Sequence, residues 1–334
     1  AMHAMMLHDS APIETEPLRL VELPDPQPGP GELRLRVHCC AVCRTDLHVI
    51  EGDLPPARRP VIPGHQIVGR VDVLGENCTQ FKIGDRVGVA WLHETDGSCR
   101  FCTTGRENLC PNSRYTGYHV DGGYAQFAIV PEAFAYPIPD AFSDEKAAPL
   151  LCAGIVGYRA YKRANLPPNG RLLIIGFGSS AHIIAQIALH HQHELYVVTR
   201  SPAHQELARQ LGARWAGERF DDLPHRVDSA ILFAPSGKLV PPALESLERG
   251  GTLALAGIHM TDVPSLNYAQ HLFNERDIHP VTANTREDGR ELLAEAAAAR
   301  VDPHITHYDL ADANRALADV KHSRIDGTAV LRIA

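Results

Sequence analysis

Three cysteines lie close together in a segment rich in Gly and Thr, with the spacing Cys99-x2-Cys102-x7-Cys110. Close thiolate spacing with a further Cys after a loop is typical of structural zinc sites, which take four ligands in a tetrahedron. Counting back by the same x2 interval gives Asp96, whose carboxylate can supply the fourth ligand, and His93 is the alternative ligand. We therefore expect a zinc lobe at about residues 93–112, against the alternative of an emptied lobe with free thiols.

Cys43, His65 and Cys152 are candidate ligands that lie far apart in the chain. Taken singly, residues of these types are more often core or surface positions than metal ligands. Two of them stand in segments dense in polar groups beside glycines, Cys43-Arg-Thr-Asp-Leu-His48 and Pro63-Gly-His-Gln-Ile-Val-Gly69. This neighbourhood favours a shared metal site, although the structural alternative stays open on these residues alone.

The remaining cysteines, Cys39, Cys40 and Cys78, fit no ligand spacing, and we expect them to be buried thiols. The even total of eight would permit disulfide bonds. A chain of this length does not need disulfide bonds for stability, its cysteines are clustered, and its first residues lack the basic and apolar regions of a secretory leader. Metal ligation is therefore the preferred interpretation.

A glycine motif, Gly176-x-Gly178-x-x-Ala181, stands between an apolar segment and a segment with helical periodicity. The first Gly permits a tight turn, the second lets the backbone approach a pyrophosphate, and the small third residue allows close packing of helix on strand. The N-terminus of the helix supplies N–H groups to the phosphates. The motif predicts a dinucleotide cofactor, with an ordinary strand-to-helix turn as the alternative.

The end of the next strand, Val198-Thr199-Arg200-Ser201, bears on the choice of cofactor. Units that bind NAD(H) usually carry an Asp or Glu here, which holds the ribose 2′-hydroxyl. This chain has no carboxylate at the position, and a guanidinium beside two hydroxyls suits a 2′-phosphate because Arg makes bidentate charge-assisted bonds. NADP(H) is therefore favoured over NAD(H), with a solvated loop cation as the alternative interpretation of Arg200.

Two kinds of element must position these residues. Short alternating segments between Gly, Pro and Asp turns run from Leu18 to about Val130 and predict a β-rich domain. After Pro149 strands alternate with helices, which indicates βαβ units and a parallel sheet. The strands expected there are 171–175, 195–199, 228–233, 252–257 and 278–283, with helices at 203–211 and 241–248 among them. The tail, with helices at 287–299 and 311–322 and a strand at 328–333, is expected to return to the first domain.

Composition limits the class of protein. The chain has 334 residues, enough for two domains, and its 44% hydrophobic and 22% charged residues are those of a globular protein. Acidic residues outnumber basic ones by 40 to 32, and no Lys/Arg run offers a nucleic-acid surface. No apolar run approaches the length of a membrane span. We therefore expect a cytoplasmic protein with neither a nucleic-acid nor a membrane partner.

At its candidate ligands the chain resembles the zinc-dependent medium-chain alcohol dehydrogenases, and within them a bacterial zinc-binding subgroup. The resemblance covers nearly the whole chain from about Leu18. It is carried by Gly64-His-Gln-x2-Gly69-x5-Gly75-x2-Cys78, Cys40-Ala-Val-Cys43-Arg-Thr-Asp46, Gly84-Asp-Arg-Val87, Trp91-Leu-His93, Leu150-Leu-Cys-Ala-Gly154, Thr199-Arg-Ser201 and Ala256-Gly-Ile-His-Met260. It implies an α/β protein with a GroES-like β-rich catalytic domain at 1–152 and 286–334, and a doubly wound parallel-sheet (Rossmann) dinucleotide-binding domain at 153–285.

The resemblance also implies site residues. Cys43, His65 and Cys152 would ligate a catalytic zinc, Asp46 would orient His65, and Asp96, Cys99, Cys102 and Cys110 would hold a structural zinc, two ions per chain. Thr45 and His48 would relay a proton from the substrate hydroxyl through the nicotinamide ribose to solvent, and Thr45, Leu54 and Trp91 would line the substrate pocket. The cofactor would be bound by Arg44, at its pyrophosphate, and by Gly176, Gly178, Ser179, Ala181, Thr199, Arg200, Ser201, Phe233 and Ile258.

Four residues depart from the family pattern. Gln66 replaces the usual Glu behind the catalytic zinc, and Asp96 replaces the usual first Cys of the lobe. Val156 stands where many relatives have a Thr beside the nicotinamide, and Thr328 where an Arg often reaches the phosphates. None of these changes removes a catalytic ligand, so the resemblance still implies activity.

The function expected from the sequence is a zinc-dependent oxidoreductase that interconverts alcohols and aldehydes or ketones, with NADP(H) favoured. A polyol or sugar dehydrogenase of the same fold is an alternative, as is a non-catalytic redox sensor that binds zinc or nucleotide. Thr45 and His48 beside Cys43 favour the enzyme, because a sensor has no use for a proton relay. By resemblance the chain is expected to form a homodimer or homotetramer.

Overall fold

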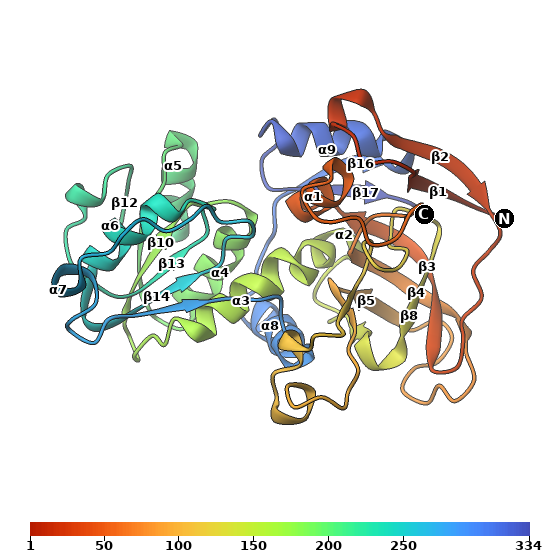
Figure 1. Cartoon of the computed structure of the whole chain (residues 1–334), viewed down its shortest axis with the longest axis horizontal. Coiled ribbons are helices and arrows are strands. Elements are labelled where there is room, and N and C mark those ends of the chain that lie inside the picture. Colours follow the sequence, from red (N-terminus) through yellow and green to blue (C-terminus); the bar gives the residue numbers. More distant parts are fainter. The chain divides into compact units, whose positions relative to one another are not determined.

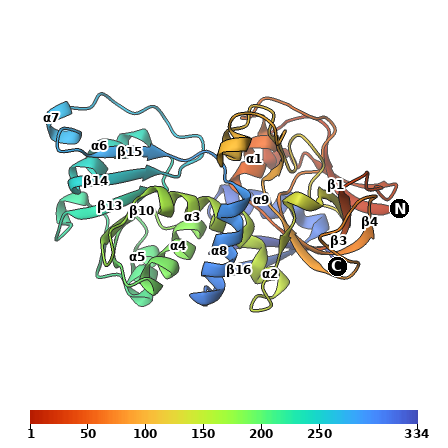
Figure 2. The ribbon, with the colours of Figure 1, turned by 90° about the horizontal axis from the view of Figure 1, so that it is seen from below.

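The computed structural model describes residues 1–334, which form two compact units (Figures 1 and 2). Unit 1 comprises Ala1–Ala153, Ala283–Ala297 and Asp302–Ala334, and unit 2 comprises Gly154–Thr282 with Ala298–Val301. The chain thus leaves unit 1 after Ala153, one residue later than the expected boundary at 152/153. It returns to unit 1 at Ala283, three residues earlier than the expected boundary at 285/286. The short segment 298–301, which belongs to unit 2, had no counterpart in the expected division.

Unit 1 is built on a seven-stranded sheet with the order β16-β17-β3-β4-β5-β9, in which β8 also pairs with β3. Its strands are β3 (Glu32–Ala41), β4 (Gln66–Leu74), β5 (Arg86–Val89), β8 (Phe127–Pro131), β9 (Tyr136–Pro137), β16 (Ile305–Asp309) and β17 (Thr328–Arg332). All pairs are antiparallel except β16 with β17. In β3 the apolar Leu33, Leu35 and Val37 alternate with charged residues and are fully buried, which is why this segment is a strand with one face on the core.

Smaller elements complete unit 1. A hairpin of β1 (Met2–Leu7) and β2 (Leu18–Leu23) precedes the sheet, and β6 (Leu92–Glu94) pairs with β7 (Arg114–Tyr115). The α-helices are α1 (Arg44–Glu51), α2 (Asp144–Ala147), α8 (Arg286–Ala298) and α9 (Ala313–Lys321). The 3-10 helices are η1 (Ile13–Thr15), η2 (Cys102–Thr104), η3 (Glu107–Leu109), η4 (Glu132–Phe134), η5 (Ala148–Leu151) and η8 (Leu310–Asp312). The strand β1 was missed by the sequence interpretation, which began the β-rich region at Leu18.

Unit 2 is a six-stranded parallel sheet with the order β12-β11-β10-β13-β14-β15. Its strands are β10 (Arg171–Ile175), β11 (Glu194–Val198), β12 (Trp215–Gly217), β13 (Val227–Leu232), β14 (Leu247–Leu255) and β15 (Asp277–Pro280). The helices are α3 (Ala153–Arg163), α4 (Ser179–His190), α5 (Pro202–Leu211), α6 (Val240–Glu245) and α7 (Tyr268–His271), with η6 (Phe220–Asp222) and η7 (Gly237–Leu239). Because the strand order reverses beside β10 and crossovers are right-handed, α4 and α6 cover opposite faces, as in a doubly wound fold.

Strand β14 begins earlier than the sequence predicts. We expected a helix over 241–248 followed by a strand at 252–257, whereas α6 ends at Glu245 and β14 starts at Leu247. The register against β13 shifts between Val227 and Ser229, and Gly250 lies at φ +73° in the same strand. A β-bulge with Gly250 in the left-handed conformation therefore allows Leu247 to pair with Val227 of β13. The periodicity of the sequence does not reveal such a bulge.

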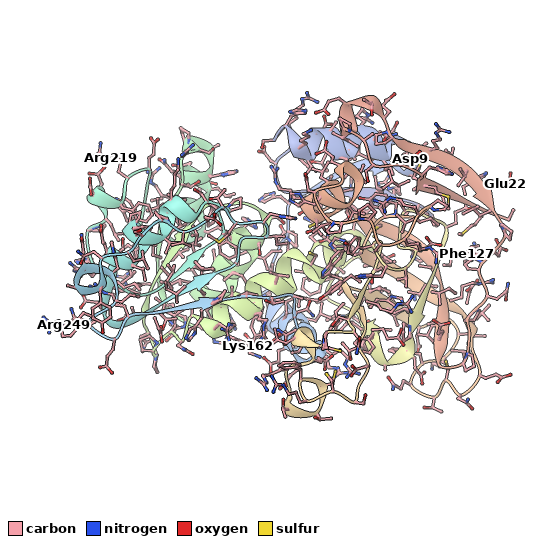
Figure 3. All side chains as sticks on the ribbon, in the orientation of Figure 1. Asp9, Glu22, Phe127, Lys162, Arg219 and Arg249 are labelled. Atoms are coloured by element: carbon pink, nitrogen blue, oxygen red, sulfur yellow. The ribbon has the colours of Figure 1, made fainter.

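Charged side chains of both signs are distributed over each unit (Figure 3). Asp9 and Glu22 of unit 1 are exposed, as are Lys162, Arg219 and Arg249 of unit 2. Among all helices of the chain, none combines the length and the apolar character needed to cross a membrane.

Candidate active site

The fold brings Cys43, His65 and Cys152 into one cluster, although each comes from a different part of unit 1. Cys43 is the N-cap residue of α1, His65 immediately precedes β4, and Cys152 directly follows η5. Their ligand atoms all lie within 4.8 Å of one another, and the two Sγ atoms are 3.8 Å apart. Three residues that are separate in sequence thus point their donor atoms at a common centre.

The geometry and the donor atoms of this cluster fit zinc. Two sulfurs that bind one tetrahedral zinc at about 2.3 Å lie about 3.8 Å from each other, as Cys43 and Cys152 do. Nε2 of His65 is buried without a hydrogen-bond partner, which is costly for a polar atom unless a ligand takes it up. Two thiols and an imidazole are a common ligand set for catalytic zinc, and they leave the fourth position open.

Asp46 fixes the orientation of His65. Its Oδ1 lies 2.9 Å from Nδ1 of His65, and the two side chains are 2% and 0% exposed. Asp46 also accepts a 3.0 Å bond from the backbone N–H of Cys43, which closes the capping box at the start of α1. Burial by itself lowers the pKa of His65, but the charge and hydrogen bond of Asp46, together with Cys43, raise this pKa to about 10.

The two thiols of the cluster differ in their ionisation. A hydrogen bond from Cys152, followed by the interaction with His65, holds the pKa of Cys43 well below its ordinary value in spite of burial. The same contact with Cys43, together with burial, raises the pKa of Cys152 well above its ordinary value. The contacts within the cluster therefore favour the thiolate at Cys43 and disfavour it at Cys152, and a zinc ion held by both would bind them as thiolates.

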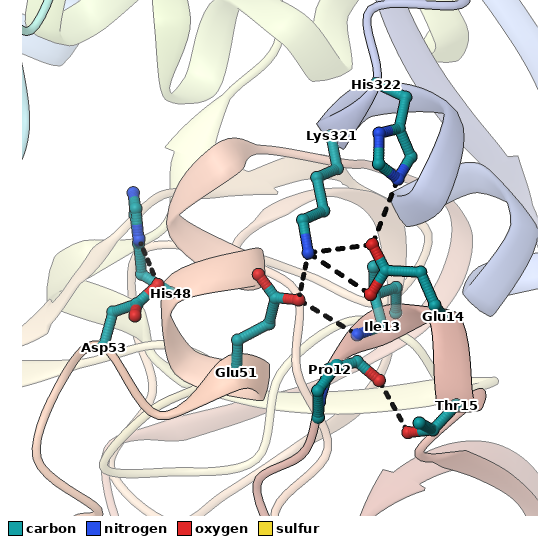
Figure 4. Close-up of polar contacts among 9 residues, drawn as sticks. All are labelled: Pro12, Ile13, Glu14, Thr15, His48, Glu51, Asp53, Lys321 and His322. Carbon is teal, nitrogen blue, oxygen red and sulfur yellow. Dashed lines mark hydrogen bonds and ion pairs between the residues drawn. The ribbon is translucent and has the colours of Figure 1, made fainter.

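Two of the residues expected in the proton relay lie on α1 next to the cluster. Thr45 is buried, and its N–H donates to Sγ of Cys43 at 3.4 Å. His48 follows almost one helical turn later, and its Nδ1 lies 2.9 Å from Oδ2 of Asp53 (Figure 4). Asp53 was not identified from the sequence, because an exposed acid in a turn after a helix carries no local signal.

The C-terminal end of α1 is anchored to other parts of unit 1. Nζ of Lys321 on α9 contacts Oε2 of Glu51 at 2.8 Å and Oε1 of Glu14 at 2.9 Å (Figure 4). Glu51 Oε2 also accepts a 3.0 Å bond from the N–H of Ile13, and Glu14 lies 3.0 Å from Nε2 of His322. The helix that carries Thr45 and His48 is thus held at both ends.

Trp91 contacts the cluster through His65. The two rings meet edge to face with centroids 4.8 Å apart, and Trp91 stacks on Tyr115 at the same centroid distance. Leu54, the second expected pocket residue, is half-buried and donates its N–H to the carbonyl of His48. Arg44 is exposed at the start of α1 and lies 3.4 Å from Oγ of Ser323.

The ligand atoms of Asp96, Cys99, Cys102 and Cys110 form a second cluster, again within 4.8 Å of one another. Oδ1 of Asp96 accepts 2.9 Å bonds from the N–H groups of Ser98 and Cys99, and Oδ2 accepts one of 2.8 Å from Nδ2 of Asn112. The bond from Asn112, followed by these backbone bonds, holds the pKa of Asp96 below its ordinary value. A carboxylate, two half-buried thiols and one buried thiol are a fitting set for a tetrahedral zinc.

The structure groups Asp96, and not the alternative His93, with the cysteines of the lobe: His93 is buried in β6, where its Nδ1 is 3.4 Å from Oγ1 of Thr116. One expectation about the cysteines is wrong. Cys78, expected to be a buried thiol, is only half-buried and contacts the carbonyl of Glu32, whereas Cys39 and Cys40 are buried. Cys78 follows a turn after β4 and not a strand, so its side chain is only partly covered.

In unit 2 the glycine motif forms the turn between β10 and α4. Gly176 has φ +85°, and a Cβ there would lie 3.2 Å from the backbone N of Ala234, so a side chain would be strained. A Cβ on Gly178 would meet no atom within 4 Å, which leaves open space beside the N-terminus of α4. Ala181 is fully buried, and a Cβ on Gly157 of α3 would lie 2.6 Å from Oγ of Ser180. The turn therefore has the features needed to accept a phosphate group: glycine where the backbone turns, and space at the helix end.

The other expected cofactor residues lie at carboxyl ends of strands in the same sheet. Thr199 follows β11 and is buried, Arg200 is exposed, and the hydroxyl of Ser201 accepts the N–H of His204 as the N-cap of α5. Phe233 follows β13 and is half-buried, and Ile258 lies beyond β14 and is exposed. Ser179 is the first residue of α4. Ligands of doubly wound sheets bind at this edge.

Comparison with known proteins gives consistent matches. The family model described as "Alcohol dehydrogenase GroES-like domain" matches residues 29–140. The "Probable alcohol dehydrogenase AdhA" of Mycobacterium tuberculosis (strain CDC 1551 / Oshkosh) is 53% identical, over 99% of this chain and 97% of that protein. A cobalt- and zinc-bound thermostable alcohol dehydrogenase from Pyrobaculum aerophilum aligns with a TM-score of 0.88 and 25% identity, over 99% of each chain. An acetophenone reductase from Geotrichum candidum in complex with NAD aligns with a TM-score of 0.87 and 25% identity, over 99% of this chain and 97% of that one.

Proposed function

Because this chain belongs to the medium-chain alcohol dehydrogenase family, we propose that it interconverts alcohols and aldehydes or ketones by hydride transfer to or from a nicotinamide cofactor at a zinc centre. The observation that carries this proposal is the cluster of Cys43, His65 and Cys152, with the unpartnered Nε2 of His65. A three-ligand set of this composition leaves room for one substrate oxygen.

A zinc ion in this cluster supplies Lewis acidity to the oxygen of a bound alcohol or carbonyl compound. The chain's own residues prepare the site for that ion. Cys43 and Cys152 offer two thiolates, which balance the double positive charge. Asp46 accepts a hydrogen bond from the Nδ1–H of His65 and so leaves Nε2 as the ligand atom.

Thr45 and His48 transfer the proton of the substrate hydroxyl. The hydroxyl of Thr45, on the first turn of α1, accepts and passes on a proton, and His48 transfers it towards solvent. Asp53 orients the ring of His48 through its contact with Nδ1. Asp53 is 54% exposed, which gives the relay an aqueous end.

The nicotinamide cofactor brings its own hydride chemistry. This chain contributes the turn at Gly176 and Gly178, and Arg200 favours NADP(H), since no carboxylate follows β11 to hold a ribose 2′-hydroxyl. The ratio of kcat/KM for NADP+ to that for NAD+ should fall in an Arg200→Ala variant. An unchanged ratio would refute the role given to Arg200.

A second zinc ion is proposed for the Asp96, Cys99, Cys102 and Cys110 cluster. Four protein ligands fill a tetrahedron, so this ion would have no position for substrate and would stabilise the lobe only. Parent protein should contain two zinc ions per chain, one for each cluster.

The deciding experiment combines metal analysis with turnover. Zinc content and turnover are measured on the same preparation: oxidation of NADPH or NADH with a panel of aldehydes and ketones that includes sugars, and reduction of NADP+ or NAD+ with the corresponding alcohols. Turnover that needs Cys43 supports the proposal, and a preference for sugars would favour a polyol or sugar dehydrogenase. Full zinc occupancy with no turnover of any alcohol, aldehyde or ketone under either cofactor would refute the enzyme.

A further inference from the structure

Tyr124 is a fully buried side chain with no role in the function proposed above, yet its hydroxyl reaches the ligand cluster. Its Oη donates a 2.8 Å hydrogen bond to Oδ2 of Asp46. The other oxygen of the same carboxylate, Oδ1, lies 2.9 Å from Nδ1 of His65. A single carboxylate therefore connects the phenol to a candidate metal ligand.

The ring of Tyr124 also packs against the backbone that precedes His65. Gly64 has φ +102°, and a Cβ there would lie 2.5 Å from Cδ1 of the tyrosine ring. The N–H of Tyr124 donates to the carbonyl of Pro63 at 3.0 Å, and that of Gly123 donates to the carbonyl of Gly64 at 3.0 Å. Tyr124 thus contacts both the main chain before His65 and the acid that orients its ring.

The hydrogen bonds leave Asp46 little freedom to rotate. Oδ2 accepts from Tyr124 and from the backbone N–H of Cys43 at 3.0 Å, while Oδ1 is taken by His65. Burial, reinforced by the charge of Asp46, raises the pKa of Tyr124 well above its ordinary value, so the hydroxyl stays a donor. Loss of this one donor would leave Oδ2 with a single bond in a buried site, where unsatisfied acceptors are costly.

We propose that Tyr124 is a positioning residue, which through Asp46 holds Nε2 of His65 in place for the metal ion. This inference rests on the zinc site of the proposed function. The competing role is that Tyr124 only fills the core. The two roles separate in a Tyr124→Phe variant, because phenylalanine keeps the ring contact with Gly64 and removes only the hydroxyl.

Tyr308 offers a matched control within the same unit. Its hydroxyl also donates to a carboxylate, Oδ2 of Asp319 at 2.6 Å, and its side chain is buried. Neither Tyr308 nor Asp319 belongs to a candidate metal cluster. A Tyr308→Phe variant therefore removes the same kind of hydrogen bond without touching the ligands.

The experiment follows zinc release from the full chain to a chromophoric chelator. The release phase that disappears in a Cys43→Ser variant is assigned to the Cys43, His65 and Cys152 cluster. Groups that orient metal-bound histidines typically change metal affinity by about 10–100-fold, so we expect Tyr124→Phe to accelerate this phase about tenfold. Tyr308→Phe should leave it unchanged. Neither variant should alter the release phase that remains in Cys43→Ser, which we assign to the Asp96, Cys99, Cys102 and Cys110 cluster.

A double-mutant cycle tests whether Tyr124 acts through Asp46. In an Asp46→Asn background, the further change Tyr124→Phe should alter the Cys43-dependent release rate less than twofold, because the connection is already lost. The ligand-field spectrum of the cobalt-substituted protein is the second readout. It should shift in Tyr124→Phe and match the parent in Tyr308→Phe.

The outcomes distinguish a failure of the positioning role of Tyr124 from a failure of the proposed zinc site. If the parent has no Cys43-dependent phase, the zinc site itself is overturned, and the role of Tyr124 with it. If that phase exists but Tyr124→Phe behaves like Tyr308→Phe in release rate and spectrum, only the positioning role is overturned. An undiminished effect of Tyr124→Phe in the Asp46→Asn background would contradict the route through Asp46.

Discussion

The two ligand clusters of unit 1 differ in how they are built. Cys43, His65 and Cys152 come from three distant segments, and two of the three are buried. The ligands Asp96 to Cys110 come from one short loop segment, and only Cys110 is buried. The first cluster is oriented by buried side chains, whereas the carboxylate of the second is held by backbone N–H groups and Asn112.

Under the proposed function, this difference corresponds to two roles for zinc. The three candidate ligands of the buried cluster would leave one coordination position for substrate, while the four candidate ligands of the surface loop would fill the coordination of an ion that only stabilises the lobe. Changes in the buried cluster should therefore act on turnover, and changes in the lobe on folding.

The largest effect is expected from Cys43→Ser. Loss of a ligand removes the centre that polarises the substrate oxygen, worth several kcal/mol, so kcat/KM should fall by about a thousandfold or more. Zinc content should drop from two ions to one, with the lobe still occupied. Steady-state kinetics and metal analysis on the same sample check this, and retention of more than a tenth of the activity would contradict it.

Asp96→Ala should show the reverse pattern. Loss of the lobe zinc is expected to cost about 4 kcal/mol of folding free energy, because loss of a bound metal is among the most destabilising changes. Zinc content should fall to one ion, while kcat/KM at low temperature stays within about threefold of the parent.

The control for Asp96→Ala is Asp96→Cys, which keeps four candidate zinc ligands in the lobe. It should retain two zinc ions and the stability of the parent in thermal unfolding. If Asp96→Ala instead lost turnover without loss of stability, the assignment of catalysis to the buried cluster and of stability to the lobe would be wrong.

His93, at the N-terminal end of the lobe segment, should make unit 1 sensitive to acid. Burial, followed by the charge of Arg114, lowers its pKa from 6.5 to about 4. Between these values the unfolded chain binds a proton that the folded chain does not, so stability is lost as pH falls from about 6.5 to 4. The group contributes up to about 3 kcal/mol to this loss.

Urea unfolding of parent and His93→Asn proteins between pH 4 and 7 measures this contribution. The variant should lose less stability than the parent over that range, whereas a matched change at the exposed His190 should have no such effect. If the free energy of unfolding depended on pH in the same way in the parent and in His93→Asn, His93 would make no contribution to the acid sensitivity.

The smallest effect is expected at the far end of α1. Lys321→Met removes the contacts with Glu14 and Glu51, and because such exposed ion pairs contribute little, only a small loss of stability is expected. Urea unfolding should detect this loss. Zinc release from the Cys43 cluster should not change, because the N-terminal end of α1 is fixed separately by its capping box; faster release would show that the two ends of α1 are coupled.

The two clusters also mark what the sequence could predict. The grouping of Asp96, Cys99, Cys102 and Cys110 was predicted from spacing, because all four lie in one loop segment, although spacing left His93 open as an alternative to Asp96. The buried cluster required a resemblance to a family, because no local pattern joins Cys43 to Cys152. Asp53 and Tyr124 were missed since their contacts are set by the tertiary fold and not by their neighbours in sequence.

Fold prediction succeeded where periodicity was strong and failed where pairing was remote. The alternating β3 and the apolar β10 were recognised, apart from the extension of β3 to Ala41. The three-residue β12 is a strand because of its partner β11, and so short a segment carries too little pattern. The six-residue β1 was missed because its apolar residues do not alternate with polar ones, and its pairing with β2 makes it a strand. The bulge in β14 likewise depends on its register against β13.

The position of β17 sets the order in which the molecule can be completed during synthesis. This strand lies inside the large sheet of unit 1, where Val330 pairs with Ala41 of β3, yet it is synthesised only after all of unit 2. Unit 2, encoded almost wholly between these two strands, can finish first. Unit 1 must then wait on the order of tens of seconds with an open sheet edge beside β3, which is where we expect nascent chains to depend on chaperones.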